Sequence, residues 1–226
     1  MGKKSWWPIE LILIIGIYGI PLQMIRFFEI SYYNYLFSAQ TIILIGYTTL
    51  LILSIFRINQ ASKNNNHSLL FFFRKKFLST DIWLVLLILT IVGTYKFLLK
   101  IEFIHIFTIS SGLPPVVHLT SVQAWSLISL LTISLPIGVI AQELYFRCFL
   151  FEIQYERFIS YTWIVNGFSW SIYHIFTPTN FLAFLPTCLM YSYIYQKRRN
   201  FWITIAIHFF NNIVVIYPLL KSLYHN

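Results

Sequence analysis

Several ionisable and amide side chains interrupt the long apolar runs of the C-terminal half: Gln142, Glu143, Arg147, His174, His208, Asn211 and Asn212. A charged side chain near the centre of a membrane helix costs about 2.5 to 3.5 kcal/mol, so each is a functional candidate. Residues four apart share a helix face, which pairs Glu143 with Arg147 and His208 with Asn212. A carboxylate or imidazole can take a proton from water, and an imidazole with an amide can stabilise an oxyanion. The pattern therefore favours hydrolysis.

A structural role is the alternative for each of these side chains. Glu143 and Arg147 could form a neutralised pair, and the His and Asn side chains could hydrogen-bond between membrane helices. Their co-occurrence in three apolar runs of the same half, with few other charges inside such runs, favours one shared site. We expect Glu143, Arg147, His174, His208 and Asn212 to converge on one cavity, because dispersing them in lipid is costly.

The overall composition is that of a membrane protein. Of 226 residues, 58% are hydrophobic and 10% charged, whereas about a quarter of an ordinary soluble domain is charged. The formal net charge is +9, and the Lys and Arg residues form short clusters between apolar runs. We therefore expect the lipid bilayer, with its anionic surface, to be the partner of these charges, and no nucleic acid.

The apolar runs are long enough for membrane helices, which need about 20 residues to cross the hydrocarbon. They predict an all-α fold, a polytopic transmembrane helical bundle of about seven spans: 7–24, 35–56, 82–99, 124–153, 159–176, 181–195 and 201–220. The fourth run exceeds one perpendicular crossing and contains Pro136, which removes a backbone hydrogen bond, so a kinked or tilted helix is expected. Its halves could otherwise form a hairpin.

Loop charges predict the orientation of the chain. With the N-terminus inside, the outer segments and span ends hold Arg26, Lys96, Lys100 and Lys221, and the inner loops hold Lys3, Lys4, Arg57, Lys63, Arg74, Lys75, Lys76, Arg157, Lys197, Arg198 and Arg199. This asymmetry follows the positive-inside rule and favours a single fourth helix. We expect a multi-pass protein of the cell (inner) membrane with a cytoplasmic N-terminus, and a basic aromatic segment at 69–77 in the cytoplasmic interface.

Three short motifs occur in order along the predicted helices. QELYFR at 142–147 resembles E-E-x-x-x-R, WSIYH at 170–174 resembles F-x-x-x-H, and HFFNN at 208–212 resembles H-x-x-x-N. This ordered set resembles the CAAX protease and bacteriocin-processing (CPBP, or Abi) family of intramembrane endopeptidases. The resemblance covers about 122–217, which we expect to be a CAAX-protease-like membrane core preceded by N-terminal transmembrane helices at 1–121.

The resemblance implies a metalloprotease-like hydrolase acting on a membrane-associated peptide or a protein C-terminus, which would enter from the cytoplasmic side. By the resemblance, the position of Gln142 and that of His174 activate water, His208 and Asn212 stabilise the oxyanion, and Arg147 holds Glu143. The cofactor is unknown. Two His and one Glu could bind a divalent metal such as zinc, but the helical H-E-x-x-H spacing is absent, so no metal ligands are assigned.

The chain departs from the family pattern at its first motif. Gln142 stands where the family has its general-base Glu, and a neutral amide cannot accept a proton from water. Glu143 could substitute, although consecutive helix positions diverge by about 100°. An active enzyme with altered chemistry and a catalytically degenerate homologue both remain open. A non-enzymatic membrane scaffold or bacteriocin-immunity protein of the same fold is the alternative, and a transporter would show paired halves.

Overall fold

The computed structural model describes residues 7–27, 32–65, 73–100, 120–174 and 181–213, and every extended element in them is a helix. The elements are α1 (Trp7–Phe27), α2 (Tyr32–Asn65), α4 (Ser79–Lys100), α5 (Ser121–Glu143), η2 (Leu144–Leu150), α6 (Phe151–Phe158), η3 (Ile159–Tyr161), α7 (Thr162–Tyr173), α8 (Phe181–Arg198) and α9 (Phe201–Ile213). The predicted all-α class is confirmed. The predicted span ends at 176 and 220 lie outside the described residues.

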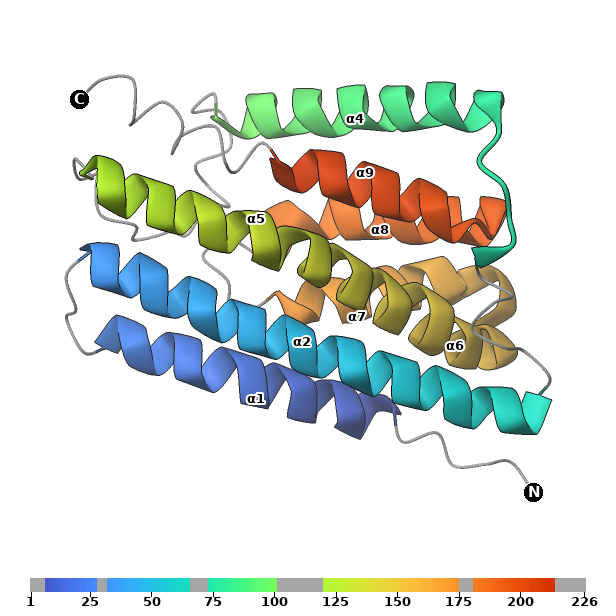
Figure 1. Cartoon of the computed structure of the whole chain (residues 1–226). Helices are drawn as coiled ribbons and strands as arrows, with labels where there is room; N and C mark the ends of the chain where they lie inside the picture. The colour runs from blue at the N-terminus through green and yellow to red at the C-terminus, as the bar shows by residue number, and fades with distance from the viewer. Residues whose placement is uncertain (1–6, 28–31, 66–72, 101–119, 175–180, 214–226) are drawn as a thin grey trace.

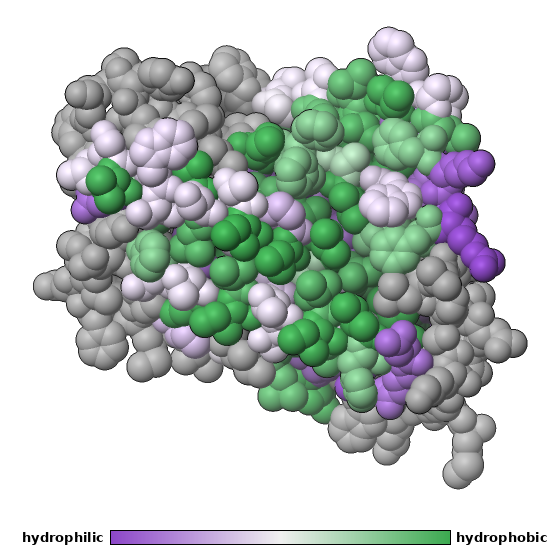
Figure 2. All heavy atoms as spheres, viewed as in Figure 1, coloured by the Kyte–Doolittle hydropathy of each residue, from purple (hydrophilic) through white to green (hydrophobic). Residues whose placement is uncertain are grey.

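The long helices run alternately in opposite directions along one axis (Figure 1). α1 packs on α2, α2 packs on α5, α7 packs on α8, and α9 lies between α5 and α4. Figure 2 shows apolar side chains across the middle of this face and hydrophilic ones mainly at the right-hand end, where α2 ends and α4 begins. The elements of the C-terminal half therefore bring the candidate residues together inside an apolar bundle.

Length and apolar composition identify two candidate membrane spans among the described residues. These are Gln40–Ala61 and the helical stretch Ser121–Tyr173, while Trp7–Gly16, Ser79–Tyr95 and Phe201–Ile213 are shorter apolar helices. The predicted count of about seven spans is therefore not confirmed.

The fourth apolar run forms one continuous helical rod from α5 through η2 to α6, rather than a hairpin. A capping box starts it, since Thr120 Oγ1 accepts from the Gln123 amide at 3.3 Å and Gln123 Oε1 accepts from the Thr120 amide at 3.0 Å. α5 continues through Pro136, and the departure from α-helical hydrogen bonding comes later, in the π-helical segment η2. The chain reverses after α6 at Ile159, whose φ is 45°.

Two glycines allow neighbouring helices to approach closely. A Cβ on Gly138 of α5 would overlap the ring of Tyr47 on α2. A Cβ on Gly167 of α7 would lie 2.8 Å from the Cα of Leu189 on α8. At Gly167 the added Cβ would meet backbone atoms of α8, so the separation of α7 and α8 requires glycine there, whereas at Gly138 the Tyr47 side chain would have to move.

Candidate active site

The first motif lies where α5 passes into the π-helical segment. Gln142 and Glu143 are the last two residues of α5, and Arg147 lies within η2, all of whose side chains are buried. In η2 the Phe146 carbonyl accepts from the Phe151 amide, five residues on. π-helical insertions of this kind frequently occur at functional sites.

Glu143 contacts both a cation and an imidazole. Its Oε2 lies 3.4 Å from Arg147 Nε, and its Oε1 lies 2.8 Å from Nδ1 of His208 on α9. The predicted pairing of Glu143 with Arg147 is therefore present. Because an ionised carboxylate only accepts hydrogen bonds, we assign the proton between Glu143 and His208 to Nδ1. The other ring nitrogen, Nε2, is then the basic one in the neutral imidazole.

Gln142 contacts the second imidazole. Its Oε1 accepts from Trp170 Nε1 at 2.9 Å and lies 3.2 Å from Nε2 of His174, the residue that caps the end of α7. Indole nitrogen can only donate, so Trp170 fixes which end of the amide carries the oxygen. That oxygen in turn requires a proton on His174 Nε2. Consecutive residues of α5 therefore each hold one histidine.

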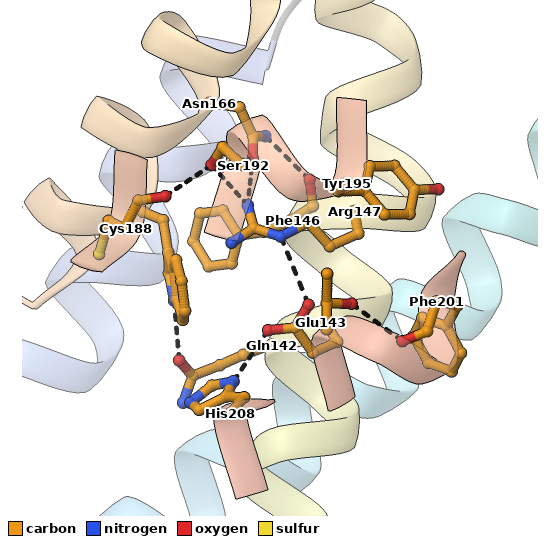
Figure 3. A network of polar contacts seen from close by, with 12 residues as sticks. Gln142, Glu143, Phe146, Arg147, Asn166, Cys188, Ser192, Tyr195, Phe201 and His208 are labelled. Carbon is orange, nitrogen blue, oxygen red and sulfur yellow. Dashed lines mark hydrogen bonds and ion pairs between the residues drawn. The ribbon is translucent and has the colours of Figure 1, made fainter. Parts of the chain in front are cut away.

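The guanidinium of Arg147 is held on several sides (Figure 3). Its Nη1 donates to Asn166 Oδ1 and, at 2.9 Å, to Ser192 Oγ. Its Cζ lies 4.5 Å from the centroid of the Trp170 ring, a cation–π distance. These contacts fix the cation that accompanies Glu143 in the apolar interior.

A buried polar network continues from Asn166 away from the histidines. Asn166 Nδ2 donates to the Phe146 carbonyl at 2.8 Å and to Gln154 Oε1 at 3.0 Å, and Gln154 Nε2 donates to Ser169 Oγ at 3.1 Å. The Phe146 carbonyl of the π-helical segment thus accepts two hydrogen bonds, one from Asn166 and one from the Phe151 amide. Asn166, Ser192 and Gln154 were not predicted as site residues from the sequence. Their only sequence signal is that they are amides and a hydroxyl in apolar runs.

The indole of Trp170 packs against both imidazoles of the site. Its ring centroid lies 5.0 Å from that of His208 and 6.0 Å from that of His174. The His174 ring also packs on Phe184 of α8, with centroids 4.5 Å apart. Trp170 therefore packs against both histidines, makes a cation–π contact with Arg147 and donates a hydrogen bond to Gln142.

Five of the six predicted site residues lie together: Gln142, Glu143, Arg147, His174 and His208, each at most 8% exposed. Asn212 differs. It follows His208 by one turn of α9, is only half-buried, and makes no side-chain hydrogen bond to these five in the described part of the chain. The neighbouring Asn211 is the more buried of the two amides, at 6% exposure.

The residues do not fit a metal centre. Within the described ranges no group of three His, Cys, Asp or Glu side chains is placed to hold an ion. One nitrogen of each imidazole is engaged, since His208 Nδ1 faces Glu143 and His174 Nε2 faces the amide oxygen of Gln142, so at most His208 Nε2 and His174 Nδ1 could face an ion. A zinc site normally needs at least three protein ligands around one point, so no step of the chemistry below is assigned to a metal.

The described helices thus form an apolar bundle in which a buried carboxylate–imidazole pair lies near a second imidazole, an arrangement compatible with a membrane-embedded hydrolase. Residues 123–214 match the model of the family described as type II CAAX prenyl endopeptidase Rce1-like. The match lies within the C-terminal region that carries the three motifs, so the predicted resemblance is confirmed there. Comparison with curated proteins and with solved structures gave no significant match.

Proposed function

We propose that the protein is an intramembrane endopeptidase that hydrolyses a peptide bond in a membrane-associated peptide or protein C-terminus. The observation that carries the proposal is the buried contact of 2.8 Å between Glu143 Oε1 and His208 Nδ1. It places a carboxylate and an imidazole in the arrangement that activates water in many hydrolases. Because position 142 is a glutamine, Glu143 is the only carboxylate in the three motifs.

In the proposed reaction, His208 Nε2 takes a proton from water while Glu143 stabilises the resulting imidazolium. The hydroxide adds to the scissile carbonyl carbon and forms a tetrahedral oxyanion. Collapse of this intermediate breaks the C–N bond, and the leaving amine receives the proton from His208. Water is consumed, and one carboxylate and one amine are formed, so no further reactant is needed.

The remaining motif residues position this pair in the proposal. Arg147 holds the Glu143 carboxylate, and its own hydrogen bonds to Asn166 and Ser192 keep it in place. Gln142, fixed by Trp170, orients His174 toward the substrate carbonyl or the water. Asn212 stays the candidate for the oxyanion amide, since its position in the third motif carries that role by resemblance.

We further propose a multi-pass protein of the cell membrane with seven crossings and a cytoplasmic N-terminus, divided into N-terminal helices at 1–121 and a protease-like core at 122–217. Arg57, Arg157 and Arg198 support this orientation, because they lie near the ends of α2, α6 and α8, at one end of the bundle. Substrate would then enter from that cytoplasmic end.

A catalytically degenerate, peptide-binding protein is the second candidate. It is favoured by Gln142, whose Oε1 already accepts from Trp170 and faces His174, and which cannot take a proton. Both candidates predict peptide binding, but only the first predicts turnover.

The deciding experiment uses the purified full-length protein in liposomes with a panel of fluorogenic peptides, prenylated and unprenylated, that end in CAAX sequences. Cleavage by the wild type that is lost in His208→Gln supports the endopeptidase. Binding without cleavage in the wild type, together with cleavage by Gln142→Glu, supports the degenerate homologue. A protein that neither binds nor cleaves any peptide, before and after Gln142→Glu, contradicts both.

A further inference from the structure

We propose that the cationic end of the bundle binds one anionic phospholipid, with the phosphate beside the α8–α9 turn and an acyl chain between α4 and α8. Two adjoining cavities carry this inference. One, of about 380 Å³, is lined by cationic side chains, and the other, of about 310 Å³, is almost wholly apolar. They share Lys197 and Arg198. This site lies outside the proposed catalytic residues.

The cationic cavity has an excess of positive charge. Lys75, Lys76, Lys197 and Arg198 all line it. Asp81 is the only carboxylate among its described lining residues; it is 1% exposed and pairs with Arg198. Asp81 also accepts from the Leu78 amide at 2.8 Å, at the start of α4. The three lysines therefore have no carboxylate within the cavity to balance them.

The backbone of the cavity wall is held in place by hydrogen bonds, while its lysine side chains are exposed. Lys75 Nζ donates to the Arg198 carbonyl at 3.3 Å, and Asn200 Nδ2 donates to the Lys76 carbonyl at 3.2 Å. Phe73 anchors the same segment on α9, because its carbonyl accepts from Trp202 Nε1 at 3.3 Å. This is the described part of the basic aromatic segment for which the sequence predicts an interfacial position. The segment is docked onto the turn between α8 and α9.

The apolar cavity continues from these cations along the helices. Thr80 and Leu84 of α4 face Tyr193 and Ile194 of α8 across it. Other apolar side chains of α4 are also exposed, among them Trp83 at 74% and Leu87 at 57% exposure, and acyl chains would cover such side chains in a membrane. The groove therefore opens where acyl chains are present.

A cationic cavity that adjoins an apolar groove fits one chemical class of ligand, an anionic phospholipid. A free anion would use only the cationic cavity, and a zwitterionic lipid would present less net charge to the lysines. An anionic phospholipid uses both, and basic pockets between membrane helices are known to bind such head groups. Its source is the leaflet at the same end of the bundle, which carries anionic lipid on the cytoplasmic side.

Native mass spectrometry of the detergent-purified full-length protein tests the site, with phosphatidylglycerol, phosphatidylcholine of the same chains and inorganic phosphate as separate probes. Each lysine near an anionic headgroup changes affinity by roughly fivefold. The variant Lys76→Gln/Lys197→Gln should therefore weaken phosphatidylglycerol binding by about 25-fold. The matched control Arg74→Gln/Arg157→Gln removes the same charge at exposed positions outside both cavities and should bind like the wild type.

A second variant tests the groove separately. Thr80→Phe fills the apolar cavity from an exposed position at the start of α4, so the fold should be kept, and it should weaken phosphatidylglycerol binding by at least fivefold. Equal binding of phosphatidylglycerol and phosphatidylcholine by the wild type would overturn the proposal. So would displacement of the lipid by millimolar inorganic phosphate, or an equal loss in the control pair. None of these outcomes depends on peptidase activity.

Discussion

The indole Nε1 of Trp170 donates to Oε1 of Gln142 across 2.9 Å of buried interior. These are the two positions at which the chain differs from its family's motifs, since the pattern has Glu and Phe there. A phenylalanine could not make this bond, whereas tryptophan supplies a donor to a side chain that lacks the negative charge of glutamate. The two departures, Gln142 and Trp170, are thus joined by a hydrogen bond. Substitutions at these positions should therefore be tested singly and together.

Gln142→Glu is expected to raise peptidase activity by up to about 10² to 10⁴-fold, because it adds a second general base beside the His208–Glu143 pair. The new carboxylate would accept from both Trp170 and His174, as Gln142 Oε1 does. The measurement is kcat/KM of the purified variant in liposomes. Trp170→Phe in the Gln142→Glu background should then alter kcat/KM much less than Trp170→Phe does alone, because both carboxylate oxygens of glutamate accept hydrogen bonds and no donor is needed to set which end faces His174.

The control is Gln154→Glu, because Gln154 is also a buried glutamine but its hydrogen bonds go to Asn166 and Ser169 and not to a histidine. Its activity should not rise. If Gln142→Glu is folded by circular dichroism and cleaves no faster than the wild type, water activation at position 142 is not how this site works.

Glu143→Gln should lower kcat/KM by at least 10²-fold, because His208 loses the carboxylate that orients it. It should also destabilise the fold by roughly 3 to 5 kcal/mol, since Arg147 would keep a buried charge without its partner. Combining Glu143→Gln with His208→Gln should cost little further activity, as groups that act as a unit are non-additive. Additive losses would show two independent roles.

Glu152→Gln is the matched control for that measurement. Glu152 also pairs with an arginine, Arg199, but its side chain is 40% exposed. An exposed pair contributes at most about 1 kcal/mol, so this variant should retain activity and nearly all of its stability.

Arg147→Lys should destabilise the protein by roughly 2 to 4 kcal/mol although it keeps the charge. An ammonium cannot reproduce the guanidinium fork that reaches Asn166 and Ser192 while facing Glu143, and hydrogen bonds to charged groups are worth about 1.5 to 3 kcal/mol each. The unfolding midpoint in a denaturing-detergent titration measures the change. Arg157→Lys, at an exposed position on α6, should leave the midpoint unchanged.

The helices were predictable because a run of apolar residues of sufficient length has few alternatives in a membrane. The single rod through Pro136 was also predictable from loop charge. The π-helical segment Leu144–Leu150 was not, since it contains neither Pro nor Gly, and the Asn166 amide that donates to its Phe146 carbonyl comes from another helix. The close approach of α7 to α8 at Gly167 could not be predicted either, because it depends on Leu189 of the facing helix.

Within the site, local spacing predicted the Glu143–Arg147 pair and failed for contacts between helices. The i,i+4 rule placed His208 with Asn212, but a rule about one helix cannot foresee that Nδ1 of His208 meets Glu143 across 65 positions. Asn166 and Ser192 were missed for the same reason: their partner Arg147 lies 19 and 45 positions away. Small polar residues of this kind are common in membrane helices.

The orientation can be tested by cysteine labelling, because both native cysteines, Cys148 and Cys188, are buried and should react slowly. Glu156→Cys and Ser121→Cys place exposed thiols near opposite ends of the α5–α6 rod. An impermeant maleimide should label Ser121→Cys in intact cells and Glu156→Cys only after permeabilisation. The reverse pattern would place the lysine-rich end outside and contradict the cytoplasmic N-terminus.

Gly167→Ala should destabilise the protein by about 1 to 3 kcal/mol, the usual result of overpacking. The added Cβ would lie 2.8 Å from both Cα and Cδ2 of Leu189, and the backbone atom cannot move without shifting α8 away from α7. Because α7 carries Trp170 and α8 carries Ser192, that shift should also lower activity through Arg147. Gly93→Ala on α4 is the control, since its Cβ would meet nothing within 4 Å. Alanine there should stabilise the helix by roughly 0.5 to 1 kcal/mol. The unfolding midpoint of each variant gives the comparison, and equal shifts of the two would mean that α7 and α8 are not in close contact at Gly167.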